Sequence, residues 1–138
     1  MSEYTTVECE YTDGDSLRGA LKELGYDSEE HAIPQSLVGF QGDQRDQKAH
    51  IIVRRKNINS ASNDIGFVKQ DGKYAMIISE FDRRTPHANT FMKKLKAVYN
   101  KHNVLKGEIH RKMKSKGFVV ASQKTDQNGR IEIRLTRR

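Results

Sequence analysis

The stretch from Phe91 to Arg137 organises the chain, and it reads FMKKLKAVYNKHNVLKGEIHRKMKSKGFVVASQKTDQNGRIEIRLTR. In its first half, apolar residues recur every three or four positions, which predicts a helix with one buried face. These apolar positions are Phe91, Leu95, Val98, Tyr99, Leu105, Ile109 and Met113. Gly117 predicts the end of the helix, because glycine readily adopts the left-handed backbone of a cap. Asn103 and Gly107 leave open whether this is one helix or a pair.

The second half of the stretch predicts a hairpin of two strands. Apolar and polar residues alternate from Phe118 to Gln123 and again, strictly, from Arg130 to Thr136. This period of two is typical of strands with one solvent-facing side. Asn128-Gly129 lies between them and supplies the positive backbone angles that a tight turn requires.

The predicted helix is strongly cationic. Between Lys93 and Lys116 there are nine Lys or Arg residues and a single acidic residue, Glu108. Helices that are merely solvated normally mix the two signs of charge. The excess therefore favours a polyanionic partner over simple solubility.

The N-terminal part of the chain predicts a strand followed by a short helix. Residues 4 to 11 alternate between apolar and acidic or polar side chains, which is typical of a strand. Asp15 is the expected N-cap of the helix, whose inner face would carry Leu17, Ala20, Leu21 and Leu24, and Gly25 is its expected end.

Further strands are expected in the middle of the chain. Residues 26 to 35 are polar and contain Pro34, which favours a loop or a short edge segment. Strands are predicted at 37–40 and 49–53, with a polar loop at 41–47 between them. A hairpin is predicted from residues 65–68 and 74–79 around Asp71-Gly72. Neighbouring strands with few crossovers predict a single α+β domain over residues 1–138, a mostly antiparallel sheet with the short N-terminal helix and the long basic helix or helix pair packed on one face.

Charge is unevenly distributed along the 138 residues. The net charge is +7, yet residues 1 to 30 hold nine acidic against two basic residues, a net charge of −7. The acidic end is therefore expected either to cover the basic surface or to lie opposite to it. No apolar run approaches the roughly 20 residues of a membrane span, and Cys9 is the only cysteine, so we expect a cytoplasmic protein without disulfides.

Short turn and strand signatures along the chain resemble a known family. They are Val38-Gly39-Phe40-Gln41-Gly42, Asp64-Ile65-Gly66-Phe67, Asp71-Gly72-Lys73-Tyr74, Gly117-Phe118-Val119-Val120, Asn128-Gly129-Arg130-Ile131 and the segment from Leu17 to Gly25. Together they are similar to the hypothetical chloroplast reading frame thirty-five family of cyanobacteria, plastids, other bacteria and some phages. That family has no assigned activity, so the resemblance implies a shared fold and no site residues.

Nucleic-acid binding without enzymatic activity or a cofactor is the leading functional hypothesis. A helical array of cations can follow a phosphate backbone, RNA or DNA, without reading its sequence. The expected phosphate contacts are Lys93, Lys94, Lys101, Arg111, Lys112 and Lys114, while the facing of Lys96 and Lys116 depends on whether the helix is broken. The expected extensions of this surface are Arg54, Arg55, Arg83, Arg84, Arg130 and Arg134.

Two other classes of function stay open. In the first, the cationic helix docks an acidic protein, as an adaptor or a subunit of a larger assembly. In the second, Asp64, Glu80 and Asp82 bind a divalent metal for phosphodiester hydrolysis, although acids near strand ends are more often turn residues. The five histidines show no zinc spacing, and Cys9 on an apolar strand face is expected to be a small core residue.

Overall fold

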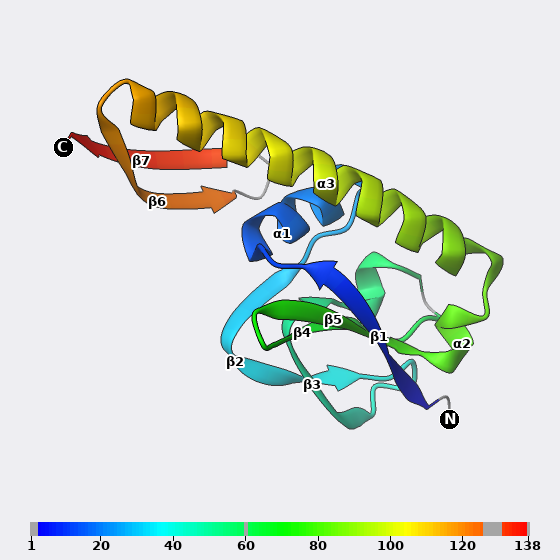
Figure 1. Cartoon of the computed structure of the whole chain (residues 1–138). Coiled ribbons are helices and arrows are strands. Elements are labelled where there is room, and N and C mark those ends of the chain that lie inside the picture. Colours follow the sequence, from blue (N-terminus) through cyan, green and yellow to red (C-terminus); the bar gives the residue numbers. More distant parts are fainter. Residues whose placement is uncertain (1–2, 60, 126–130, 138) are drawn as a thin grey trace.

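The computed structural model describes residues 3–59, 61–125 and 131–137. They form one α+β unit in which a five-stranded antiparallel sheet carries the helices on one face (Figure 1). The elements in chain order are β1 (Tyr4–Tyr11), α1 (Gly14–Glu23), β2 (Glu29–Val38), β3 (Gln44–Val53), the 3-10 turn η1 (Arg55–Asn57), β4 (Ile65–Gln70), β5 (Lys73–Ser79), α2 (Glu80–Arg83), α3 (Pro86–Ser115), β6 (Phe118–Thr125) and β7 (Ile131–Arg137).

The five strands follow the spatial order β1-β5-β4-β3-β2, and every neighbouring pair is antiparallel. The predicted hairpin around Asp71-Gly72 is confirmed, because both residues have a positive φ, 52° and 79°, and join β4 to β5. The predicted fold class is therefore confirmed.

Two predictions for the segment before β4 are wrong. Residues 29–38 form a ten-residue strand, not a loop or a short segment, and β3 already begins at Gln44 within the expected loop. β2 is an edge strand, so Pro34 does not interrupt a central ladder, and the register with β3 shifts between Glu30 and Gln35. Its exposed polar side chains hid the strand because an edge strand need not show a clean apolar alternation.

Helix α1 begins two residues earlier than expected. The N-cap is Asp13, not Asp15, because Asp13 Oδ2 accepts a hydrogen bond from the Ser16 amide at 2.9 Å. The inner face is as predicted, with Leu17, Ala20 and Leu21 buried, and Gly25 follows the helix with φ of 94°.

The main core lies between the sheet and the two longer helices. Leu17 and Leu21 of α1 and Leu95 of α3 are fully buried in one apolar cluster with Phe67 of β4. Tyr99 of α3 belongs to the same cluster, and its hydroxyl oxygen accepts hydrogen bonds from the Thr12 and Asp13 amides at 2.9 and 3.1 Å. This contact fixes α3 to the start of α1.

Helix α3 is one unbroken helix of 30 residues, about 45 Å long, which settles the question left open at Asn103 and Gly107. It begins at Pro86 and ends before Gly117, whose φ is 84° as the cap prediction requires. The prediction that Leu105 faces the core is wrong, since its side chain is 46% exposed. Leu105 follows Leu95 by ten residues, or about 2.8 turns, which carries it roughly 80° away from the buried direction.

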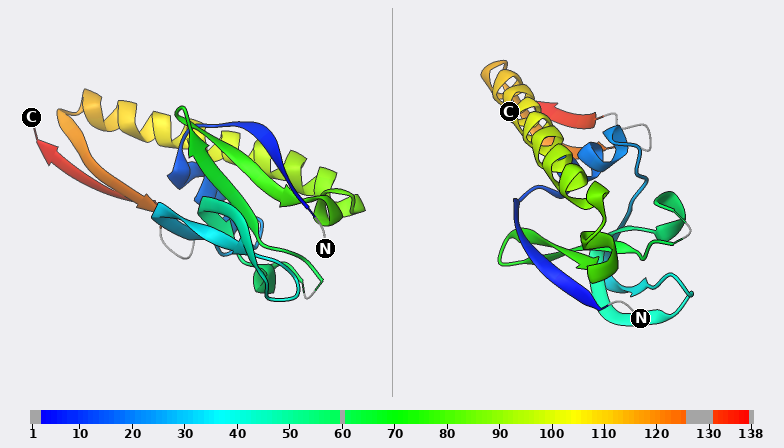
Figure 2. Two further views of the ribbon diagram at one scale, coloured as in Figure 1. Left: turned by 90° about the horizontal axis from the view of Figure 1, so that it is seen from below. Right: turned by 90° about the vertical axis from the view of Figure 1, so that its right-hand side faces the viewer.

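The C-terminal hairpin forms a separate two-stranded sheet. β6 pairs antiparallel with β7 from Phe118 opposite Arg137 to Thr125 opposite Ile131, so the predicted pairing is confirmed. The expected turn residues Asn128 and Gly129 lie outside the described residues. The hairpin runs back along the C-terminal half of α3, beyond the edge of the five-stranded sheet (Figure 2, left). No helix among the described residues is both long and apolar enough to cross a membrane.

Replacing Gly66 by alanine should lower the free energy of unfolding by about 1–3 kcal/mol, because the site is already fully packed. A Cβ atom there would lie 2.6 Å from Ala49 Cβ and 2.9 Å from Leu37 Cδ2. Chemical denaturation measures the change. Gly107→Ala is the matched control, since the nearest atom to a new Cβ is Arg111 Nη1 at 3.5 Å. The control should stabilise α3 by up to about 1 kcal/mol, and equal effects of the two substitutions would contradict this packing.

Candidate nucleic-acid interface

The solvent-facing side of α3 carries two groups of exposed cations, one near each end. We call Lys93, Lys94 and Lys96 the N-terminal cationic cluster, and Arg111, Lys112 and Lys114 the C-terminal cationic cluster. None of the six forms an ion pair with another described residue. The sequence left open which way Lys96 faces. Since the helix is continuous, Lys96 is exposed on the same surface as Lys93 and Lys94.

The two clusters repeat the same pattern at a separation of 18 residues. Lys93 and Arg111, Lys94 and Lys112, and Lys96 and Lys114 are each 18 positions apart. Eighteen residues make five full turns, so each pair projects in the same direction with its backbone positions about 27 Å apart. Figure 1 shows α3 along the outer side of the molecule, with the sheet, α1 and the hairpin all on its opposite side. The two clusters therefore repeat the same three directions around the outer part of α3, with Lys93 and Arg111 in the middle row.

Acidic residues at the two ends of α1, Asp13 and Glu23, pair with lysines in the middle of α3. Lys101 Nζ lies 2.8 Å from Glu23 Oε2, and Lys106 Nζ lies 2.6 Å from Asp13 Oδ1. Lys101, one of the expected phosphate contacts, is thus already paired, although its side chain is 64% exposed. The acidic N-terminal segment covers part of the basic helix and leaves both clusters free of it.

These contacts shift the pKa values of the two carboxyl groups. Hydrogen bonding from Lys101 lowers the pKa of Glu23. Burial by itself would raise the pKa of Asp13, but hydrogen bonds from Lys106 and Ser16 outweigh it, so the pKa of Asp13 is lowered. A lowered pKa in the folded state means that the stabilisation is present above the ordinary carboxyl pKa and is lost as the pH falls through the folded value.

The surface between the two clusters also carries exposed apolar side chains. Val104 is 60% exposed and Leu105 is 46% exposed, and both lie in the solvent-facing part of α3. Glu108 is exposed beside them. The cationic surface thus has cations unpaired within the described chain at its two ends, and between them lie exposed apolar residues, Glu108 and the paired Lys101.

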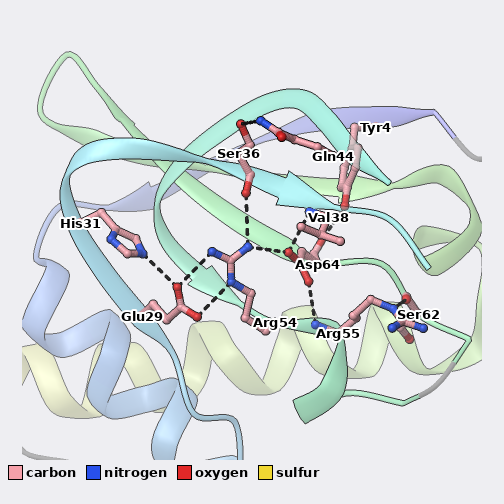
Figure 3. Close-up of polar contacts among 10 residues, drawn as sticks. All are labelled: Tyr4, Glu29, His31, Ser36, Val38, Gln44, Arg54, Arg55, Ser62 and Asp64. Carbon is pink, nitrogen blue, oxygen red and sulfur yellow. Dashed lines mark hydrogen bonds and ion pairs between the residues drawn. The ribbon is translucent and has the colours of Figure 1, made fainter. Parts of the chain in front are cut away.

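Arg54, an expected extension of the surface, is occupied within the fold (Figure 3). Its Nε and Nη2 donate to the two carboxylate oxygens of Glu29 at 2.9 and 3.1 Å, and Nη1 donates to Asp64 Oδ2 at 2.8 Å. Hydrogen bonding from Arg54 lowers the pKa of Glu29, and His31 adds a second contact at 2.9 Å. The positive charge of Arg54 is therefore balanced by two carboxylates.

Asp64 is fully buried and holds three segments together. Its Oδ2 accepts from the Val38 amide at 2.8 Å as well as from Arg54, and its Oδ1 accepts from the Arg55 amide at 2.7 Å. The Arg55 side chain turns toward the Ser62 carbonyl, to which its Nε donates at 3.0 Å. Arg54 and Arg55 thus mainly join β3 to the following loop. The signal that identifies this role is an acid placed directly before a buried strand, Asp64-Ile65-Gly66-Phe67.

The other expected extensions have different surroundings. Arg83 and Arg84 are exposed in and after α2, which lies beside the N-terminal end of α3, and each approaches Glu80 at 3.8 Å (Figure 1). Arg134 is exposed on β7. Arg130 lies outside the described residues. Arg83 and Arg84 are therefore the predicted extensions that lie at the same end of the molecule as the N-terminal cationic cluster.

The three acids considered for a metal do not converge. Both oxygens of Asp64 are engaged as described, and Asp82 accepts from Ser79 and Asn63. Within the described ranges, no group of three or more His, Cys, Asp or Glu residues is placed to hold a metal ion. Cys9 is half-buried against the main core, and burial raises the pKa of its thiol.

The chain was compared with curated proteins, solved structures and models of protein families. No curated protein and no solved structure matches the chain. One family model, described as "Protein of unknown function (DUF1257)", matches residues 20–135, which span every element from the end of α1 to β7. The chain therefore belongs to this uncharacterised family.

Proposed function

We propose that the protein binds nucleic acid through the solvent-facing side of α3, with phosphate contacts from the two cationic clusters. The observation that carries the proposal is the repetition of three exposed cations after five helical turns on one unbroken helix. Lys and Arg side chains neutralise phosphates and release condensed counterions, which supplies affinity without sequence recognition.

The chemistry of this surface favours backbone contacts over base recognition. Base-stacking proteins place aromatic side chains between their cations. On α3 the aromatic residues Phe91 and Tyr99 pack against the main core, so they are not available for stacking. We therefore propose that binding has weak or no sequence preference. We also propose that the protein is cytoplasmic, and that the family matched here is the hypothetical chloroplast reading frame thirty-five family.

Fluorescence anisotropy of labelled single-stranded and duplex DNA and RNA, titrated with protein between 50 and 200 mM salt, tests the proposal. Six phosphate contacts give a slope of log affinity against log salt of about −5, hence an affinity loss of roughly 10³-fold over this range. A slope near zero, or no binding at 50 mM salt, would overturn the proposal. It would then favour an acidic protein as the partner of α3.

Glu23→Gln should increase nucleic-acid affinity severalfold, because it frees Lys101 from its ion pair and removes a negative charge beside the interface. One additional phosphate contact makes the salt slope steeper by about 0.9. Asp46→Asn is the matched control, since it makes the same change in net charge at an exposed position of β3, and it should leave the slope unchanged. Equal effects of both substitutions would show that net charge alone governs affinity.

A further inference from the structure

A second candidate binding site lies beside α2 and the first turns of α3. A cavity of about 340 Å³ opens there between Ile58, which follows η1, and the helices, with Ile65 and Ile78 of the sheet behind it. Ligand pockets typically begin at about 300 Å³, and a buried apolar cavity of about 150 Å³ already binds benzene. The volume therefore suits a ligand with one or two fused rings.

Aromatic side chains form much of the cavity wall. Tyr26, Phe81 and Phe91 all line it, and the rings of Tyr26 and Phe91 meet edge to face with centroids 5.2 Å apart. Phe81 is 49% exposed, which is unusual for a large apolar side chain at the rim of a core. A flat apolar ligand would cover this ring and bury surface that now faces water.

One carboxylate in the wall lacks a counter-charge. Asp82 lines the cavity and is only 7% exposed. Its Oδ2 accepts hydrogen bonds from Ser79 Oγ at 2.8 Å and from the amide and side-chain nitrogens of Asn63 at 3.1 and 3.3 Å. Its Oδ1 accepts from no described residue and is not among the fully buried polar atoms of the described chain, so it remains accessible. Asp82 forms no ion pair within the described chain. A largely buried carboxylate that lacks a counter-charge attracts a cation, so a ligand that supplies one gains affinity.

We infer that this cavity binds a small organic cation, namely an ammonium group carried on a flat aromatic body. The ammonium group donates to Asp82 Oδ1, and the aromatic body packs between Phe81, Phe91 and the aliphatic wall. Aromatic faces also attract cations directly, which adds to the preference for a charged ligand. This site is separate from the cationic clusters of α3 and does not depend on nucleic-acid binding.

Tryptamine is a suitable probe, because the chain contains no tryptophan and the indole emission is therefore seen against tyrosine alone. Tryptophol, which carries a hydroxyl in place of the amine, is the neutral match. We expect saturable binding of tryptamine to the full chain, at least ~10-fold tighter than tryptophol, as a charge-assisted hydrogen bond to a buried group provides. Equal affinities, or no saturation by millimolar tryptamine, would overturn the inference.

Two substitutions locate the site. Phe81→Ala should weaken tryptamine at least ~10-fold through lost packing, while Phe40→Ala, a comparably exposed phenylalanine outside the cavity at 41%, should leave affinity unchanged. Asp82→Asn keeps an acceptor for Ser79 and Asn63, so it should abolish the preference for tryptamine over tryptophol. If Asp82→Asn fails to fold, the comparison of Phe81→Ala with Phe40→Ala still tests the location of the site. Equal affinities of these two variants for tryptamine would contradict it.

Discussion

Reversing four cations of α3, in the variant Lys93→Glu, Lys94→Glu, Arg111→Glu and Lys112→Glu, should lower nucleic-acid affinity at least ~100-fold at 100 mM salt. The variant removes four of six proposed phosphate contacts and replaces attraction by repulsion. The salt slope should fall in magnitude from about 5 to below 2. Anisotropy titration of the variant against wild type measures both changes.

Stability should change little in this variant, because all four side chains are exposed and unpaired within the described chain. We expect the thermal midpoint to stay within about 4 °C of wild type, a cost near 1 kcal/mol for the altered helix charges. The matched control reverses four exposed lysines outside α3, Lys48, Lys56, Lys69 and Lys73, and so reaches the same net charge. An equal loss of affinity in the control would contradict a localised interface.

Asp64→Ala should lower the free energy of unfolding by about 3–5 kcal/mol, the cost of breaking a buried ion pair from one side. The substitution leaves the Val38 and Arg55 amides and Arg54 Nη1 without the acceptor they now share. Urea unfolding at pH 7 measures the change. The loss is large because Asp64 has no exposed surface, so water cannot replace the lost contacts without opening the fold.

The companion variant Glu29→Ala separates burial from charge. Glu29 pairs with the same guanidinium, but its side chain is 41% exposed, so water can solvate Arg54 on that side. Its loss should cost no more than about 1 kcal/mol. Similar costs for the two variants would show that Asp64 does not anchor this junction.

The sequence predicted well those features that depend on periodicity and on turn chemistry. The hairpin at Asp71-Gly72, the pairing of β6 with β7, and the glycine ends of α1 and α3 all follow from local rules. Strand β2 could not be predicted from the sequence, because it is an edge strand with one side open to solvent, and neither its composition nor its alternation is typical of a strand. The register of that edge is set by packing that no local pattern encodes.

The abundance of cations on α3 could be predicted from the sequence, but their ion pairing could not. Counting charges placed it on α3, but only the fold shows that Lys101 and Lys106 are paired with α1, since Glu23 and Asp13 lie about 80 to 90 positions away in the chain. The sequence likewise does not show that Arg54 is paired with Glu29 and Asp64, and so it was predicted as a phosphate contact. Long-range ion pairs decide which cations are free, and sequence proximity does not reveal them.

Amide NMR spectra of isotope-labelled protein, recorded with and without the oligonucleotide that binds most tightly, show whether nucleic acid binds to α3. We expect chemical-shift changes along α3 at both cationic clusters, near residues 93–96 and 111–114, with smaller changes at α2. The strands β2 and β3 around Arg54 should be unaffected. Changes centred on Arg54 and Arg55, with α3 unperturbed, would contradict the proposed interface.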